Sequence, residues 1–282
     1  MKRILIPTDF SANAWNTILY AMELFKNIPC EFHVLNTYEV KPVQLISTVS
    51  SKRVGHYYDA VRIKSEEGLE MILDDIRNSK PSAEHIFKTI SQSGSLVKIV
   101  QEITADSHFD MLIIGTKGAT GAKEIFLGSN THRIIKSVHN CPILVVPDEA
   151  FFEDISKIAF ATNFERIYYR SEVVPILNLA KHQDATIRMI HVYDKPELEK
   201  VQRYNSSSLE HYFKGVTYDF HVIRDFSNIE KAIQAFIEEL EIDILAMINY
   251  EHSFIERLTR EAVIKKLTFH TTIPFLVIPS DN

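Results

Sequence analysis

The residues best suited to do chemistry are glycines in one short stretch of the chain. Residues 113–138 read IIGTKGATGAKEIFLGSNTHRIIKSV, and their first sixteen positions hold four of the eight glycines in the chain. Glycine permits positive φ and lets backbone N–H groups approach a ligand without a Cβ in the way. Gly128 and Ser129 open a helical pattern, and the free N–H groups of a helix start bind anions. The stretch therefore predicts a site for a phosphate chain.

The spacing of these glycines differs from the common phosphate-binding loops. No register supplies the Gly-Lys-Ser/Thr ending of GxxxxGK[ST], and Lys117 stands where GxGxxG needs its second glycine. The pattern present is Gly115-x2-Gly118, nine residues, and then Gly128-Ser129. Without further context, a glycine-rich loop of this kind is more often a turn than a ligand site.

The elements around this stretch alternate between strands and helices. Short runs rich in Ile, Val and Leu, separated by helical patterns, are typical of a parallel sheet covered on both faces. Ligands bind such sheets at the carboxyl ends of the strands, where Gly115 ends the run MLIIG. Strands are expected at 3–7, 32–35, 84–90, 111–115 and 142–147, and helices at 11–27, 61–79, 96–105 and 129–138, with 40–60 as a loop or lid.

The pattern then begins again. KRILIPTDFS near the start is answered by SKIAFATNFE at 156–165, FHVLNTY by IHVYDK at 190–195, and CPILVVPD by IPFLVIPS at 273–280. A repeat of about 140 residues is too long for a solenoid unit and indicates a duplicated α/β domain. We expect domains at 1–150 and 151–282, joined by the short acidic stretch 148–156.

Composition narrows the class of protein. A net charge of −6 over 282 residues argues against non-specific nucleic-acid binding. The sequence has neither a signal peptide pattern nor a membrane-spanning run, which predicts no membrane partner and a cytoplasmic location. The two cysteines, Cys30 and Cys141, are expected to be buried thiols in a reducing compartment.

At Gly115-x2-Gly118-x9-Gly128-Ser129 the sequence resembles the universal stress proteins of the nucleotide-binding type, whose motif is G-x2-G-x9-G-[ST]. Residues 7–11, Pro-Thr-Asp-Phe-Ser, resemble the P-x-D-x-S opening of that family, and CPILVVP at 141–147 resembles its closing strand. Both halves align coarsely. The resemblance implies two tandem Rossmann-like domains of the adenine nucleotide alpha hydrolase-like fold, each with a five-stranded parallel sheet.

The resemblance also implies a ligand and its contacts. ATP or another adenine nucleotide would lie across the ends of the first and fourth strands, with Mg²⁺ or Mn²⁺ as an accompanying ion. Family members pair through the fifth strand, which implies pairing of the halves within one chain or a homodimer. The implied site residues are Pro7, Thr8, Asp9, Val34, Ile114, Gly115, Gly118, Gly128, Ser129 and Asn130.

Several of these residues have an alternative structural role. Asp9 could instead cap the helix that follows it. Val34 is a core strand residue on either account, and Lys117 and Lys123 fit solvated loop positions as well as phosphate contacts. In the 40–60 segment, Arg53, Tyr57 and Tyr58 are candidate ligand contacts, although a loop without ligand contacts is the simpler reading.

The second half lacks the motif. Asn163 stands in place of Asp9, and no glycine follows the expected strand 243–248. Arg260-Glu261 falls near the place of Gly128-Ser129, and a glutamate there would repel a phosphate. The nucleotide site is therefore expected to be absent from this half. Asn249, Glu251 and His252 could form a different polar site, but no metal-ligand spacing occurs.

Three functions remain open at this stage. The leading one is an adenine-nucleotide-binding stress-response protein that acts as a sensor, with slow ATP hydrolysis at most. The second is an ATP-hydrolysing or nucleotidyl-transfer enzyme of the related fold, although the sequence offers a phosphate cradle without a kinase or esterase motif. The third is a small-ligand or protein interaction module without nucleotide.

Overall fold

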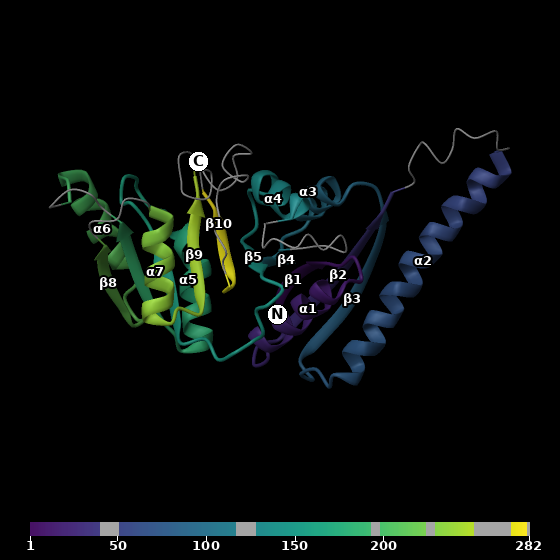
Figure 1. Ribbon diagram of the computed structural model, residues 1–282, viewed down its shortest axis with the longest axis horizontal. Helices are drawn as coiled ribbons and strands as arrows, with labels where there is room; N and C mark the ends of the chain where they lie inside the picture. Colours follow the sequence, from purple (N-terminus) through teal and green to yellow (C-terminus); the bar gives the residue numbers. More distant parts are fainter. Residues whose placement is uncertain (40–50, 117–127, 193–197, 224–228, 251–271, 281–282) are drawn as a thin grey trace. The chain divides into compact units, whose positions relative to one another are not determined.

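The structure is a computed structural model that describes residues 1–39, 51–116, 128–192, 198–223, 229–250 and 272–280 (Figure 1). Contacts divide these residues into two units. The first comprises the described residues up to Cys141, and the second comprises those from Pro142 onward. Each unit is an α/β structure built on a mostly parallel sheet, as the alternation of apolar runs and helical patterns predicts.

The sheet of the first unit consists of parallel strands in the order β3-β2-β1-β4. The buried strands are apolar, because a sheet covered on both faces leaves no solvent side. The bounds are β1 Lys2–Pro7, β2 Cys30–Tyr38, β3 His85–Ser93 and β4 Met111–Gly115, the last as predicted. Adjacent connections diverge between β1 and β4, which places a ligand crevice at their carboxyl ends.

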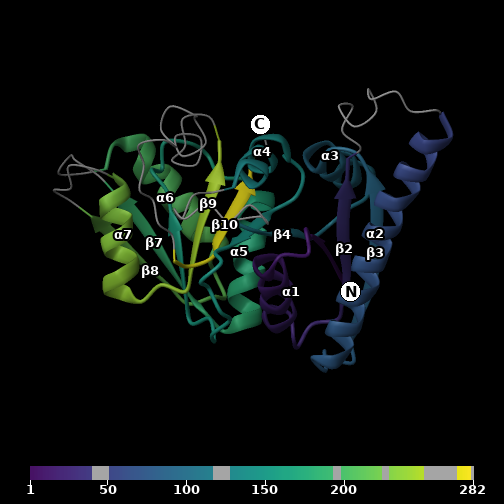
Figure 2. The ribbon, with the colours of Figure 1, turned by 45° about the vertical axis from the view of Figure 1, so that its right-hand side comes forward.

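Four helices accompany this sheet in the described part of the unit. Successive strands from β1 to β3 are added toward one edge of the sheet, and β4 is added on the other side of β1. Right-handed crossovers therefore place α1 and α2 on one face and α3 and α4 on the other. Figure 2 shows α2 running along β3. The bounds are α1 Ala12–Leu24, α2 Ser51–Asn78, α3 Leu96–Asp106 and α4 Ser129–Ser137.

The long helix α2 begins earlier than predicted. The expected loop at 40–60 is helical from Ser51, so that part of the prediction is wrong, and residues 40–50 lie outside the described residues. Tyr58, Asp59 and Ala60 are exposed in this first part of α2. A helix that buries so little there shows no clear apolar periodicity, which explains the missed start.

The second unit has the strand order β5-β10-β9-β6-β7-β8. Its strand pairs are parallel except β5–β10, where Val145 faces Phe275 in an antiparallel pair. The strands are β5 Ile143–Val146, β6 Lys157–Ala161, β7 Thr186–Val192, β8 Tyr218–Ile223, β9 Ile244–Asn249 and β10 Phe275–Pro279. The helices are α5 Arg170–Gln183, α6 Lys200–Tyr212 and α7 Ile229–Leu240.

The strand β5 comes from the first sequence repeat but belongs by its contacts to the second unit. The first unit therefore holds four described strands of its own, where the resemblance implies five. Pairing with β10 covers an edge of β5 that would otherwise expose unpaired backbone groups. A pairing of the last strands of the two repeats is what the resemblance implies.

The two repeats share local geometry beyond their sequence likeness. The residue after Asp9, Phe10, has φ of 64°, and the residue after Asn163, Phe164, has φ of 55°. Both values lie in the left-handed region that bulky residues rarely adopt. The N–H of Ser11 donates to Asp9 Oδ1 at 3.1 Å, and the N–H of Glu165 donates to Asn163 Oδ1 at 3.2 Å. The same strained turn thus follows the first strand of each repeat.

Strand pairing corrects one detail of the repeat. The sequence aligns His191 with His33 through the shared His-Val pair. In the structure Thr8 N–H donates to Leu35 O at 2.8 Å, and Thr162 N–H donates to Ile190 O at 2.9 Å. His191 therefore corresponds to Asn36. A two-residue match in an apolar strand cannot fix the register, whereas the backbone ladder does.

Both cysteines are buried, as expected. Burial raises the pKa of the Cys30 and Cys141 thiols to about 12, so both stay protonated at neutral pH. They therefore serve as small apolar side chains in the core. Across the described ranges, no helix has the length and apolar character needed to cross a bilayer.

Candidate functional site

A cavity of about 250 Å³ opens at the carboxyl ends of β1, β2 and β4 in the first unit. Its position is the crevice between diverging connections that open parallel sheets use for ligands. Eight of the ten predicted residues line it, namely Pro7, Thr8, Asp9, Ile114, Gly115, Gly128, Ser129 and Asn130. Segments more than a hundred residues apart in the sequence meet in one concave site.

The turn after β1 forms one wall of the cavity. Thr8 is buried, and its hydroxyl accepts the N–H of Phe10 at 3.1 Å. Asp9 is exposed, and its Oδ1 accepts the N–H of Ser11. The helix cap is Ser11, whose hydroxyl accepts the N–H of Ala14 at 3.2 Å. Ser11 takes the capping role that was the alternative for Asp9, and the Asp9 carboxylate lies at the cavity wall.

The start of α4 forms the opposite wall. Gly128 is the N-cap and has no side chain to accept the first N–H groups of the helix. Its own N–H donates to Thr116 O at 2.5 Å, which ties the helix start to the end of β4. No acidic residue lies in the first turn of α4. An uncapped helix start without negative charge favours an anion, both through its N–H groups and through the helix dipole.

Gly115 has a packing reason for being glycine. A Cβ on Gly115 would lie 2.6 Å from Asn13 Nδ2 and 3.0 Å from Thr17 Oγ1 of α1. Real side chains do not pack so closely, so a larger residue at this position would require the Asn13 and Thr17 side chains to move. The Gly115 carbonyl accepts the Thr131 hydroxyl at 2.8 Å, which also fixes α4. The close approach of helices to the strand end, and not a positive φ, explains this glycine.

The remaining site predictions have different outcomes. Val34 is fully buried in β2 and is not among the cavity-lining residues. Gly118 lies outside the described residues, as do Lys117, Gly121 and Lys123. The Tyr58 hydroxyl is 3.1 Å from Ser93 Oγ, and Tyr58 is not among the residues that line the cavity. The side chains of Arg53 and Tyr57 lie outside the description.

Five lining residues were missed by the sequence reading. They are Ala14, Asn36, Thr37, Leu96 and Thr131. Asn36 and Thr37 follow the apolar part of β2, where polar residues at a strand end could have indicated the site. Asn36 is buried, and its Nδ2 donates to Thr8 O at 2.8 Å. It therefore joins the ends of β1 and β2 at the cavity wall.

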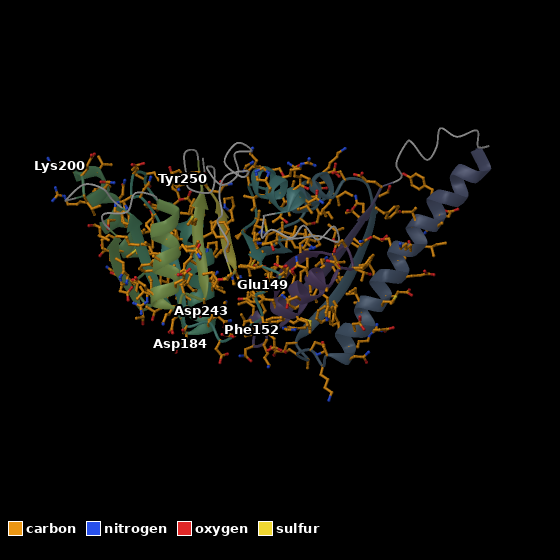
Figure 3. All side chains as sticks on the ribbon, in the orientation of Figure 1. Glu149, Phe152, Asp184, Lys200, Asp243 and Tyr250 are labelled. Carbon is orange, nitrogen blue, oxygen red and sulfur yellow. The ribbon has the colours of Figure 1, made fainter. Side chains whose placement is uncertain are left out.

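At the carboxyl ends of β6 and β9 in the second unit, described side chains bind one another. Register places Ile248 where the first unit has Gly115, and Tyr250 follows at the carboxyl end of β9 (Figure 3). The Tyr250 hydroxyl donates to Asn163 Oδ1 at 2.7 Å, and Gln202 Nε2 donates to Asn163 O at 3.0 Å. The residue equivalent to Asp9 is thus held by internal hydrogen bonds. Asn163 is partly buried, whereas Asp9 is exposed.

The loop after β6 adds a buried ion pair to this arrangement. α1 begins four residues after Thr8, whereas α5 begins eight residues after Thr162, so a longer loop precedes α5. From that loop, Arg166 Nη2 donates to Glu172 Oε1 at 2.5 Å, and Glu172 is buried. The guanidinium also lies 5.1 Å from the ring centre of Tyr250. Arg166 thus lies against Tyr250, whose hydroxyl binds the residue that corresponds to Asp9.

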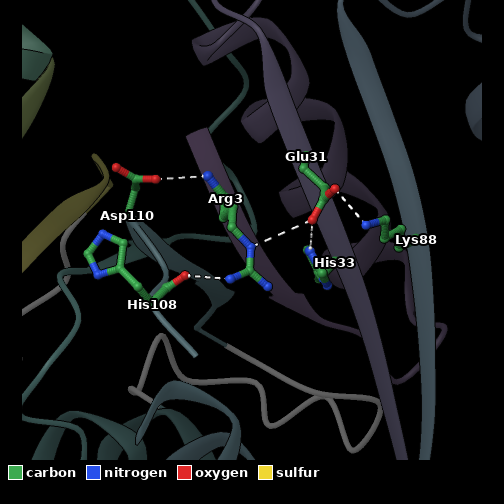
Figure 4. A network of polar contacts seen from close by, with 6 residues as sticks. All are labelled: Arg3, Glu31, His33, Lys88, His108 and Asp110. Atoms are coloured by element: carbon green, nitrogen blue, oxygen red, sulfur yellow. Dashed lines mark hydrogen bonds and ion pairs between the residues drawn. The ribbon is translucent and has the colours of Figure 1, made fainter. Parts of the chain in front are cut away.

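A cluster of charged residues lies toward the amino ends of the strands of the first unit, away from the cavity (Figure 4). Glu31 is buried and accepts from His33 Nε2 at 2.6 Å and from Lys88 Nζ at 2.6 Å. Arg3 Nε lies 3.6 Å from Glu31 Oε1. The hydrogen bond from Lys88, followed by that from His33, lowers the pKa of Glu31 from 4.5 to about 2. The cluster joins β1, β2 and β3 and is structural.

Replacing Glu31 with glutamine should make the free energy of unfolding less dependent on pH in the acidic range. Because the folded-state pKa of Glu31 is lowered, its stabilisation is complete above about pH 4.5 and is lost as the pH falls toward 2. We expect Glu31→Gln to cost about 1 kcal/mol at pH 6, since the lysine and arginine partners are partly exposed. Urea unfolding at pH 6 and at pH 2.5 measures this. If Glu31→Gln lowered the free energy of unfolding equally at both pH values, the lowered pKa of Glu31 in the folded protein would be contradicted.

No cluster of three or more His, Cys, Asp or Glu side chains able to hold a metal ion occurs among the residues that the structure describes. Among the described residues that line the cavity, Asp9 is the single acidic one. The cavity walls therefore match an anionic ligand at the α4 start and a hydroxyl-bearing ligand at Asp9.

Comparison with known proteins gives matches over both halves. A model described as the Universal stress protein family matches residues 1–147. A universal stress protein of Methanocaldococcus jannaschii is 30% identical over 154 residues, covering 51% of this chain and 94% of that protein. One from Synechocystis is 23% identical over 298 residues, covering 98% of this chain and 99% of that protein.

Among solved structures, a universal stress protein from Archaeoglobus fulgidus has the same fold. The TM-score is 0.73 at 18% sequence identity, and the match covers 98% of this chain and 97% of that chain. At this identity the likeness concerns the fold. It extends over both units, so the tandem arrangement of the chain has a solved counterpart.

Proposed function

Because the chain belongs to the universal stress protein family, we propose that its first half binds one adenine nucleotide, with ATP as the expected ligand. The observation that carries the proposal is the single cavity that collects the turn after β1, the end of β4 and the start of α4. These are the segments that carry the Pro-Thr-Asp-Phe-Ser opening and the G-x2-G-x9-G-[ST] motif in the sequence.

The phosphate chain is proposed to bind at the start of α4. The N–H groups of Ser129 and Asn130 and the Ser129 hydroxyl can donate to phosphate oxygens, and Gly128 presents no side chain to compete. A Mg²⁺ or Mn²⁺ ion would accompany the phosphates and be held by phosphate and water oxygens.

The nucleoside is proposed to bind between the ends of β1 and β2. The Asp9 carboxylate would accept a ribose hydroxyl, a charge-assisted hydrogen bond that distinguishes a nucleotide from inorganic phosphate. Ile114, Ala14 and Leu96 supply apolar surface in the same cavity, which suits the faces of a flat base. Val34 would support this wall from the core.

The proposed role is binding and sensing, without fast turnover. Phosphoryl transfer needs a group that orients a nucleophile, in addition to charge neutralisation. Among the described lining residues, Asp9 is the one carboxylate that could act as a base, and its proposed partner is the ribose. We therefore expect a stress-response protein that acts through the nucleotide-bound state.

One nucleotide per chain is proposed, bound by a domain spanning 1–150. The domain spanning 151–282 would not bind a nucleotide, since the residue in place of Asp9 is Asn163, which binds Tyr250, and no glycine follows β9 in the sequence. The second domain would instead contribute through its pairing strand β10.

Calorimetric titration of ATP with Mg²⁺ into the full chain tests the proposal. The expected result is one site per chain, with at most slow phosphate release over hours in the same sample. Inorganic triphosphate is the matched control and should bind more weakly, because it lacks the nucleoside. Two sites per chain would show that the second domain also binds a nucleotide. Repeated turnover of ATP would favour the ATP-hydrolysing enzyme. No binding would refute a nucleotide function.

A further inference from the structure

A buried hydrogen-bond chain links α2 to the turn that carries Asp9. Ser65 of α2 is 3% exposed, and its hydroxyl donates to Asn36 Oδ1 at 2.7 Å. The other end of the same amide, Asn36 Nδ2, donates to Thr8 O at 2.8 Å. Ser91 Oγ lies 2.8 Å from Ser65 Oγ and can donate to it. Ser65 lies 29 residues from Asn36 in the sequence and is not among the residues that line the cavity.

The direction of these hydrogen bonds determines which end of the Asn36 amide faces Thr8. An amide can present either its oxygen or its nitrogen to a neighbour, and only the nitrogen can donate to the Thr8 carbonyl. By donating to Asn36 Oδ1, the Ser65 hydroxyl holds the amide in the orientation that aims Nδ2 at Thr8. Without the Ser65 hydroxyl, the buried oxygen of the Asn36 amide would lose this donor, which costs free energy. A flip or displacement of the amide would reduce that cost.

A second contact joins α2 to the same turn. The ring of Phe10, next to Asp9, lies against Gly68, and a Cβ there would be 2.5 Å from Phe10 Cζ. Ser65 and Gly68 are three residues apart and so share one face of α2. Phe10 has φ of 64°, a conformation that persists only where the surroundings impose it. One face of α2 therefore supports both sides of Asp9.

The second unit holds its matching turn in another way. Asn205 of α6 donates to Phe164 O at 2.9 Å, and Gln202 of α6 donates to Asn163 O. There the helix binds the turn directly and its donors occupy two loop carbonyls. In the first unit the support passes through Asn36, and the cavity in front of Asp9 stays open.

We infer that Ser65, with Gly68, is a positioning residue of the nucleotide site, acting through Asn36 and Thr8 to fix the Asp9 carboxylate. The inference rests on the proposed function for its ligand. The placement of the turn is a property of the protein alone and can be measured without ligand.

The test is a double-mutant cycle of Ser65→Ala and Asp9→Ala, with ATP affinity measured by calorimetry on the full chain. If Ser65 acts through Asp9, Ser65→Ala weakens ATP binding about fivefold in the wild-type background and has little further effect in Asp9→Ala. Ser79→Ala is the matched control, because that hydroxyl donates to Ile76 O at 2.7 Å and has no link to the turn. Equal effects of Ser65→Ala in both backgrounds would overturn the inference.

A second variant separates positioning from stability. Gly68→Ala should raise the helical propensity of α2, yet it forces the Phe10 ring to move. We expect weaker ATP binding in a protein that is no less stable. Unchanged affinity in Gly68→Ala would contradict a positioning role for this face of α2.

Hydrogen exchange without ligand distinguishes the two levels of the proposal. Ser65→Ala, but not Ser79→Ala, should speed exchange of the Phe10 and Ser11 amides, which are bonded to Thr8 and Asp9 side chains. If wild type fails to bind ATP while this exchange difference is present, the proposed function fails and the positioning stands. Exchange that is unaltered in Ser65→Ala refutes the positioning itself.

Discussion

Gly128→Glu is expected to weaken ATP binding at least about 100-fold, which corresponds to about 2.7 kcal/mol. The carboxylate would sit at the N-cap of α4 and accept the N–H groups proposed for the phosphates. It would also place a negative charge beside the phosphate chain. Gly128 has φ of −56° and ψ of 149°, which any residue can adopt, so the backbone should not be strained.

Two further substitutions at Gly128 separate charge from size. Gly128→Gln has the same shape as glutamate without its charge, and Gly128→Ala adds a single carbon. The expected order of ATP affinity is wild type, then alanine, then glutamine, then glutamate. Thermal unfolding should show all four proteins folded. Equal affinity of the glutamate variant and wild type would mean that the phosphates do not bind at the start of α4.

Arg166→Met is expected to destabilise the second unit by about 3 kcal/mol, because it leaves the Glu172 carboxylate buried without its partner. The double variant Arg166→Met/Glu172→Gln should recover much of this loss, since a neutral amide can still accept the Tyr169 N–H that Glu172 Oε2 accepts at 2.9 Å. Denaturant unfolding followed by a probe in the second unit measures both variants.

The same pair of variants bears on the function. If the Arg166–Glu172 pair has a structural role alone, the double variant still binds one ATP per chain. A cost for Arg166→Met below about 0.5 kcal/mol would show that the pair is a surface interaction. Arg133→Met, an exposed arginine in α4, is the matched control and should have little effect on stability.

Much of the fold can be predicted from apolar periodicity. β4 matches its predicted residues, and Ser11 caps α1 as the sequence suggests. These elements are predictable because burial requires continuous apolar runs and because a serine before an apolar helix is a frequent cap. The start of α2 could not be predicted, since exposed residues there carry no periodic signal.

The candidate site is predictable only where the chemistry is local. The helix start at Gly128 and the turn at Asp9 are both contiguous motifs. Asn36 is marked only as a polar residue at a strand end, and its bond to Ser65 depends on which helix packs against which strand, so no spacing in the sequence points to Ser65. The packing reason for Gly115 likewise depends on α1, and the interaction of Tyr250 with Asn163 depends on β9 lying beside β6.

The repeat illustrates the same limit. Sequence likeness identifies two copies, but it aligns His191 with His33, whereas the ladder aligns His191 with Asn36. His191 Nδ1 lies 2.9 Å from Thr162 O, and Asn36 Nδ2 lies 2.8 Å from Thr8 O. A residue of another type thus makes the equivalent contact. Burial lowers the pKa of His191, which favours the neutral ring in this role.

A crystal structure of the full chain with a non-hydrolysable ATP analogue and Mg²⁺ tests the central claim most directly. The account predicts one nucleotide, with its phosphates at the N–H groups of Ser129 and Asn130 and its ribose within hydrogen-bond distance of Asp9. Asn163 should keep its bond to Tyr250 with no ligand beside it. A nucleotide bound in the second unit, or bound away from the start of α4, would contradict the account.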